Sequence, residues 1–184
     1  MEEWLKLMFL QTGVGFAVAG AIGAVMFGGV GSAKGIAIAG GQAGGVLSEK
    51  PELFGKLLVM IALPGTQGFY ALICAIMIAL RIGLINGKVV CTWAEGLALF
   101  AIGIGMGVVQ WRSAISQGEA SAAAIAMTAK KPEESGRAIL LPALVETYAV
   151  VALLAAILLI IWVTNPNLEI INTAGKIVAP AAGN

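Results

Sequence analysis

Residues 137–164 read RAILLPALVETYAVVALLAAILLIIWVT, an apolar run in which Glu146 is the single carboxylate. A membrane-spanning helix needs about 20 predominantly apolar residues, and this run exceeds that length. Because the bilayer core offers no water to satisfy backbone polar groups, such a run forms a helix rather than an open strand. The stretch therefore predicts a transmembrane helix that carries one acidic group.

Three further apolar runs precede it, at about residues 10–47, 57–84 and 93–129. The chain is 59% hydrophobic and only 11% charged, whereas a soluble domain has about 25% charged residues. Residues 1–4, MEEW, lack the positive start of a secretory signal, so we expect the first span to stay in the mature protein. The composition predicts an all-α membrane protein with four transmembrane helices.

Basic residues are unevenly distributed among the connections between these spans. Most of them lie at the connection between the first and second spans and at the one between the third and fourth, namely Lys50, Lys56, Lys130, Lys131 and Arg137. The opposite side of the membrane would have mainly Lys6, Arg81 and Lys88. The positive-inside rule places the first group in the cytoplasm. We therefore expect a multi-pass protein of the cell membrane with both termini outside the cytoplasm.

An internal repeat relates the two halves of the chain. The tripeptide KPE at 50–52 recurs at 131–133, and the pair SA at 32–33 recurs at 113–114, each 81 positions later. Parallel internal repeats are one signature of transporters. We expect two tandem helical hairpins, residues 1–86 and 87–164, followed by a C-terminal tail, 165–184, to which no role can be assigned.

Glu146 lies near the centre of the membrane. It follows Arg137 by nine residues, which corresponds to about 13 Å of helix. A charge at that depth costs at least about 2.5–3.5 kcal/mol, so the carboxylate needs a partner, a cation or a proton. The residue predicts an ion or proton site, and a structural glutamate paired between helices is the alternative.

The second span carries a polar face at a similar depth. Its members, at i, i+3, i+4 and i+7, are Leu63, Thr66, Gln67 and Tyr70. Pro64 has no amide proton to donate to the helix, which leaves backbone carbonyls available as ligands. The alternative is that Thr66 and Gln67 only join helices.

Gln117 in the third span adds another amide oxygen at intermediate depth. Hard cations take oxygen ligands, and one carboxylate balances one positive charge. A proton carrier would need only the carboxylate in an apolar pocket. The additional oxygens therefore favour Na⁺ as the transported ion, with H⁺ as the alternative.

Several functions are disfavoured by what the chain lacks. It has no His, and Cys74 and Cys91 are not spaced as a CxxC pair, so we expect neither a zinc centre nor a disulfide. Clustered basic residues typical of nucleic-acid binding are missing, as is the Walker A pattern of ATP hydrolysis. A small membrane enzyme would need a nucleophile and a base, and a channel would need polar groups along its length rather than at one depth.

Glycine is abundant in the first and third spans, with Gly103, Gly105 and Gly107 alternating in the third. Small residues let helices approach closely in a membrane. This pattern indicates either ordinary tight packing or the crowded inner layer of a ring.

With LPGTQGFY at 63–70 and LVETYA at 144–149, the chain resembles the duplicated proteolipid, the K or c subunit, of V-type rotary ATPases. Bacterial Na⁺-translocating members are the most similar, and the resemblance covers about residues 12–164. It implies a homo-oligomeric, two-layered rotor ring that carries ions while other subunits hydrolyse ATP, so that this subunit is not an enzyme by itself. The implied partners are identical subunits, a membrane stator, central-stalk subunits at the cytoplasmic connections, and lipid.

The resemblance also implies a role for each site residue. Glu146 matches the ion-binding carboxylate, and Tyr70 matches a residue that hydrogen-bonds it. The Na⁺ ligands implied are Leu63 (through its carbonyl), Thr66, Gln67, Gln117 and Glu146. Gly65 lies 81 positions before Glu146, so the first hairpin has lost its carboxylate.

Arg112 and Glu119 depart from the family pattern. They are seven residues apart in the third span and so share a helix face. We expect them on an exposed face, where they pair with each other or line the interior of a ring.

Overall fold

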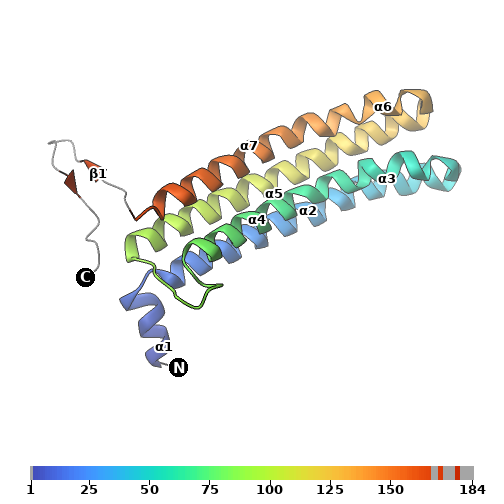
Figure 1. Cartoon of the computed structure of the whole chain (residues 1–184). Helices are drawn as coiled ribbons and strands as arrows, with labels where there is room; N and C mark the ends of the chain where they lie inside the picture. The colour runs from blue at the N-terminus through green and yellow to red at the C-terminus, as the bar shows by residue number, and fades with distance from the viewer. Residues whose placement is uncertain (1, 167–169, 172–176, 179–184) are drawn as a thin grey trace.

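The computed structural model describes residues 2–166, 170–171 and 177–178, and four long helical segments form its elongated bundle (Figure 1). All four are long and apolar enough to cross a membrane. The first is α2 (Val14–Glu49) and the third is α5 (Trp93–Lys130). The second comprises η2 (Pro51–Leu53), α3 (Phe54–Ala62), η3 (Leu63–Gly65) and α4 (Thr66–Arg81). The fourth comprises η4 (Pro132–Glu134), α6 (Ser135–Ala138) and α7 (Leu140–Val163).

The four predicted spans are confirmed, but two of them begin earlier than predicted. Pro51 and Pro132 each open a 3₁₀ turn that leads into a helix, because proline suits the first helical turn, where its missing N–H leaves no bond unmade. The second span ends at Arg81 rather than at residue 84. Gly83 adopts a φ of +76° there, a conformation that turns the chain out of the helix.

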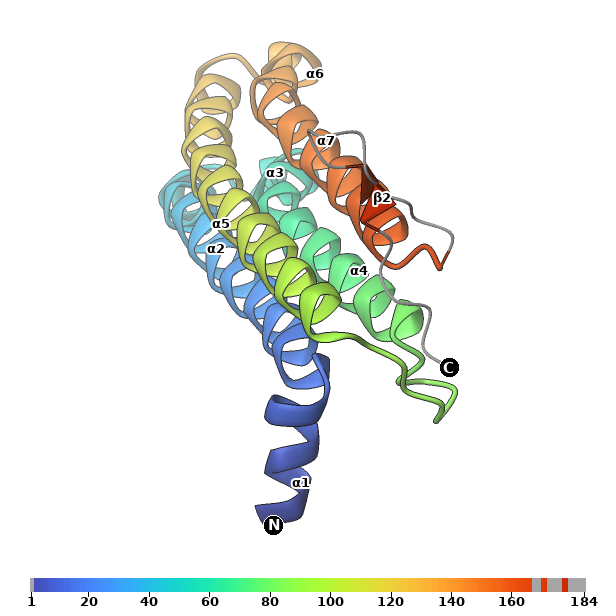
Figure 2. The same ribbon diagram turned by 90° about the vertical axis from the view of Figure 1, so that its left-hand side faces the viewer.

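The helices are arranged as two neighbouring hairpins of the same orientation. α2 runs along α5, α4 packs on α2, and α7 packs on α5 (Figure 2). A Cβ on Gly103 would lie 2.2 Å from the Gly20 carbonyl oxygen, and one on Gly118 would lie 2.5 Å from the Gly35 carbonyl oxygen. Glycine at these positions is what allows α2 and α5 to pack with their backbones in contact.

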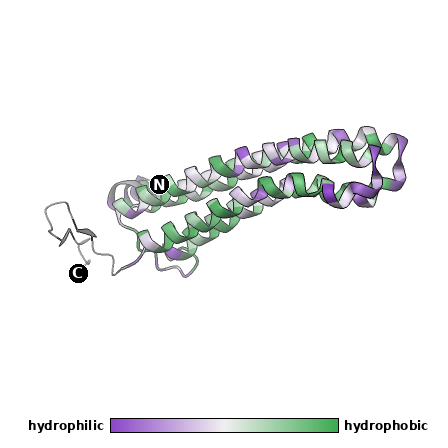
Figure 3. Ribbon diagram, turned by 90° about the horizontal axis from the view of Figure 1, so that it is seen from above, coloured by the Kyte–Doolittle hydropathy of each residue, from purple (hydrophilic) through white to green (hydrophobic). Residues whose placement is uncertain are grey.

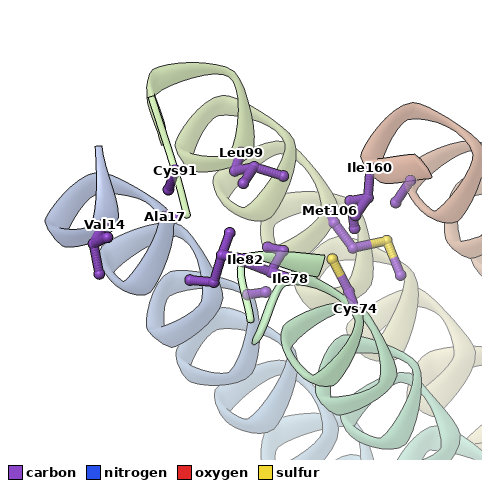
Figure 4. Close-up of a cluster of buried hydrophobic side chains, with 11 residues drawn as sticks. Val14, Ala17, Cys74, Ile78, Ile82, Cys91, Leu99, Met106 and Ile160 are labelled. Carbon is purple, nitrogen blue, oxygen red and sulfur yellow. The ribbon is translucent and has the colours of Figure 1, made fainter. Parts of the chain in front are cut away.

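One apolar cluster fills the bundle near the loop between α4 and α5 (Figure 4). It includes Val14, Ile78, Ile82, Leu99, Met106 and Ile160, together with both cysteines, Cys74 and Cys91. The cysteines are free thiols. They serve as buried apolar side chains in this cluster.

Hydrophobic residues predominate along most of the bundle, and the end formed by η2 and η4 is hydrophilic (Figure 3). α7 exposes large apolar side chains along its length, including Leu144, Val151, Leu154 and Leu158. A water-soluble chain would not expose such a continuous apolar surface. The molecule is therefore a multi-pass membrane protein.

The ends of the chain depart from the predicted pattern. α1 (Glu2–Lys6) and a π-helical turn, η1 (Leu7–Gln11), precede the bundle, and Thr12 is extended between η1 and α2. The first span therefore begins at Val14 rather than at residue 10. In the tail, β1 (Ile170–Ile171) pairs antiparallel with β2 (Ile177–Val178), an element that the sequence did not predict; the remaining tail residues from 167 onward lie outside the described ones.

Candidate cation site

Glu146 projects from α7 toward α4 and α5 and is half-buried. The Tyr70 hydroxyl donates a 2.5 Å hydrogen bond to Glu146 Oε1. Gln117 Nε2 lies 3.4 Å from Glu146 Oε2 and donates to it. Both carboxylate oxygens therefore have a donor, each from a different helix.

A chain of amides continues from this carboxylate into the bundle. Gln67 and Gln117 are fully buried, and Gln67 Nε2 donates to Gln117 Oε1 at 2.5 Å. Gln67 Nε2 also lies 3.4 Å from Ser113 Oγ. Gln117 Nε2 donates to the Pro142 carbonyl at 3.0 Å. The network thus joins α4, α5 and α7 at the depth of Glu146.

Three oxygens lie together at the start of α4. The Thr66 hydroxyl donates to the Leu63 carbonyl at 3.0 Å and is 3.4 Å from Gln67 Oε1. Pro64 and the 3₁₀ turn of η3 produce this arrangement, because the Thr66 amide bonds to the Leu63 carbonyl rather than to a carbonyl four residues back. A backbone carbonyl, a hydroxyl and an amide oxygen therefore face one another beside the polar network.

The structure brings together the site residues that the sequence singled out. Glu146 directly contacts Tyr70 and Gln117, Gln117 contacts Gln67, and Gln67 contacts Thr66. The donor set consists of one carboxylate and several neutral oxygens, which suits a hard cation of low charge. Among the described residues, no group of three or more His, Cys, Asp or Glu could hold a metal ion.

Three polar contacts around the site were not predicted. Ser113 Oγ neighbours Gln67, Ser32 Oγ accepts from the Gly68 amide at 2.8 Å, and Gln110 Nε2 donates to the Ala149 carbonyl at 2.9 Å. Ser32 and Ser113 are equivalent positions of the internal repeat, which is a signal that could have identified them. Gln110 lies seven residues before Gln117 on the same helix face, a spacing that also could have indicated it.

Arg112 and Glu119 lie on the exposed surface of α5, as predicted, but they do not pair with each other in the part of the chain that the structure describes. They are seven residues apart, which is about two helical turns, or about 10 Å along the axis. That distance is too long for an ion pair. Neither contributes to the polar network around Glu146. Lys34 in α2 is a further exposed charge inside a span, which the sequence pattern did not single out.

Comparison with known proteins identifies the family. The family model that describes the C subunit of ATP synthase matches residues 19–78 and again residues 94–159. The K subunit of the V-type sodium ATPase of Enterococcus hirae is 36% identical, over 81% of this chain and 92% of that protein. The K subunit of the A-type ATP synthase of Methanocaldococcus jannaschii is 39% identical, over 82% of this chain and 65% of that protein.

Members of this family are non-catalytic subunits that form the rotor rings of rotary ATPases. The two matches of one family model fall on the two hairpins, one on each. The chain therefore belongs to the family of ATP synthase C subunits, as a duplicated proteolipid of the V- and A-type ATPases.

Proposed function

We propose that this chain carries Na⁺ across the cell membrane as the ring subunit of a V-type ATPase. The observation that carries the proposal is the half-buried carboxylate of Glu146, the one acidic side chain of α7, bonded by Tyr70 and Gln117. The similarity to a protein whose name assigns it to a V-type sodium ATPase supports the choice of ion. Glu146 would supply the negative charge that balances the cation.

The neutral ligands in this proposal are the Leu63 carbonyl, the Thr66 hydroxyl and the amide oxygens of Gln67 and Gln117. The Thr66 hydroxyl oxygen lies 3.0 Å from the Leu63 carbonyl oxygen and 3.4 Å from Gln67 Oε1. Gln117 connects them to Glu146, because it contacts both Gln67 and the carboxylate. Tyr70 would orient the carboxylate without contacting the ion. A proton alone would require none of these neutral oxygens, so their presence favours Na⁺ over H⁺.

Only the second hairpin would bind an ion, giving one ion per four helices. In the first hairpin Gly65 occupies the position equivalent to Glu146, and Ile36 occupies the position equivalent to Gln117. A Cβ on Gly65 would lie 3.3 Å from Ile36 Cδ1, so the two positions face each other as Glu146 and Gln117 do. In this hairpin both the carboxylate and its amide donor are replaced by nonpolar residues.

Transport would proceed by rotation of a ring of identical subunits. A bare carboxylate facing lipid is penalised by several kcal/mol, so each site must be neutralised by its cation before it leaves the membrane stator. Near the stator, a fixed positive charge would displace the ion into the exit path. Moving one charge against 100 mV costs about 2.3 kcal/mol, which ATP hydrolysis in other subunits would supply.

The connections at Pro51 and Pro132 would face the cytoplasm and contact the central stalk. Lys50 Nζ donates to the Ala129 carbonyl at 2.6 Å, and Lys56 Nζ donates to the Pro132 carbonyl at 2.9 Å. These bonds link the two connections into one surface. The termini would then lie on the outer side of the membrane.

Carbodiimide labelling of the ring in membranes tests this function. We expect modification of Glu146, and we expect Na⁺ to protect it at fixed pH. Glu119→Gln is the matched control, because Glu119 is exposed and lies outside the network, so this variant should label as the wild type does. Labelling of Glu146 that Na⁺ leaves unchanged would indicate proton transport instead, and a Glu146 that is not modified would contradict both.

A further inference from the structure

Two glutamines of α5 bind α7 in the same way on either side of Glu146. Gln117 Nε2 donates to the Pro142 carbonyl at 3.0 Å, and Gln110 Nε2 donates to the Ala149 carbonyl at 2.9 Å. The two donors are seven residues apart on α5, and the two acceptors are seven residues apart on α7. Since the helices run antiparallel, the two bonds fix one register between them, and Glu146 lies between the two acceptors.

The contact that these bonds reinforce is narrow. The buried residues of α7 are Pro142, Ala149, Ala156 and Ile160, which form one stripe along the helix. Most of its other side chains are apolar and are half-buried or exposed. In a bilayer there is no hydrophobic driving force to hold such a helix against its neighbour, because lipid is as apolar as the side chains. The position of α7 therefore depends strongly on its polar bonds to α4 and α5.

Gln110 is placed to act on Glu146 through the α7 backbone. It is fully buried, and its acceptor Ala149 is three residues after Glu146, less than one helical turn away. Gln110 Oε1 has no hydrogen-bond partner in the described part of the chain, so the amide is held through its nitrogen, by the Ala149 carbonyl and a 3.4 Å contact to Met106 Sδ. A buried amide with one unpaired oxygen is costly in a membrane, which indicates that the residue is not there for stability alone.

We infer that Gln110 is a positioning residue for the ion site, which holds Glu146 at the distance from Gln117 and Tyr70 that cation binding needs. The inference rests on the proposed function of Glu146. Among the bonds from α5, Gln117 fixes one point of α7 before Glu146, while Arg81 of α4 holds the far end of the helix at Thr164. Gln110 supplies the second point, so that the segment between Pro142 and Ala149 keeps its orientation when the ion leaves.

The test compares Gln110→Met, which keeps the length but removes the donor, with Gln110→Asn, which is too short to reach Ala149. Thr128→Val is the matched control, since Thr128 is equally buried on α5 but bonds Ala124 and Met60 rather than α7. The assembled ring in membranes is labelled with carbodiimide at fixed pH over a series of Na⁺ concentrations. The measured quantity is the Na⁺ concentration that halves the labelling of Glu146.

Because each Gln110 variant loses one hydrogen bond, we expect both to need about two- to tenfold more Na⁺ to halve the labelling of Glu146. Thr128→Val should need the wild-type concentration. A purely structural Gln110 would instead lower the thermal stability of the ring while leaving the half-protecting concentration unchanged, and that result would overturn the inference.

A second readout separates this inference from the proposed function. Amide hydrogen exchange of residues 142–150 should accelerate in Gln110→Met and stay unchanged in Thr128→Val. If Na⁺ does not protect wild-type Glu146, the proposed function fails, and the exchange rates still decide whether Gln110 holds α7. Unchanged exchange in Gln110→Met would remove the basis for a positioning role.

Discussion

The Tyr70 hydroxyl donates a 2.5 Å hydrogen bond to Glu146 Oε1, and this bond joins the first hairpin of the chain to the second. Tyr70 belongs to α4 and Glu146 to α7, so neither hairpin contains the site by itself. Gln117 of α5 completes it from a third helix. In the proposed function, the hairpin that has Gly65 in place of a carboxylate would thus supply ligands to the site.

Replacing Tyr70 by Phe should weaken cation binding without unfolding the ring. The change removes one hydrogen bond to a carboxylate, worth about 1 kcal/mol in a membrane protein, so about fivefold more Na⁺ should be needed to protect Glu146 from carbodiimide. Tyr148→Phe is the control, because Tyr148 is 77% exposed. Equal protection in the two variants would show that the Tyr70 bond does not support the site.

Glu146→Gln should abolish ion transport, because the amide cannot balance the charge of a cation at that depth. ATP-driven Na⁺ uptake into vesicles that contain the whole complex should fall to background, while the amount of assembled ring remains. The exposed Glu119→Gln variant should transport at the wild-type rate. Uptake by Glu146→Gln above background would contradict the assignment of the carboxylate.

Gly103→Ala should destabilise the bundle, since its new Cβ would meet the Gly20 carbonyl oxygen at 2.2 Å. Overpacking of this kind costs about 1–3 kcal/mol, which should lower the apparent unfolding temperature of the solubilised ring. Gly136→Ala is the matched control, because a Cβ there meets nothing within 4 Å. A similar unfolding temperature for the two variants would disagree with the close contact of α2 and α5.

Arg81 stabilises the end of α7 from the neighbouring helix. Its Nε donates to Thr164 Oγ1 at 2.7 Å, and its NH2 group donates to the Thr164 carbonyl at 3.2 Å. A cation near the C-terminal carbonyls of a helix is worth about 0.3–1 kcal/mol. Arg81→Met should therefore accelerate amide hydrogen exchange in the last turn of α7 by up to about fivefold, whereas Lys88→Met should leave it unchanged. An unaltered last turn in Arg81→Met would show that the contact is not stabilising.

Alkylation of Cys91, which lies in the loop before α5, should be slow at neutral pH. Burial and the nearby carboxylate of Glu95 raise the pKa of the Cys91 thiol to about 11. The thiolate is the reactive form, and its fraction grows as pH rises toward the pKa. The rate of iodoacetamide modification should therefore increase about tenfold per pH unit between pH 7 and 10. A rate that levels off near pH 9 would mean an ordinary thiol, and Glu95→Gln should move the profile to lower pH.

The sequence alone identified the four spans and the duplication, and it singled out the residues of the candidate site. Apolar runs determine helices in a membrane because every backbone group must bond within its own segment, so these features needed no tertiary information. The 3.6-residue period also places Leu63, Thr66, Gln67 and Tyr70 on one face. In the same way, the depth expected for Glu146 comes from counting residues from Arg137.

Only the tertiary structure decided which faces meet and in what register. Periodicity assigns a residue to a face of its own helix, but the partner across the interface depends on close packing between helices, such as that of Gly20 on Gly103. The bond from Gln110 to Ala149 follows from that packing. The physical reason is that helix formation is local in sequence, whereas the alignment of α5 with α7 depends on side chains far apart in the chain.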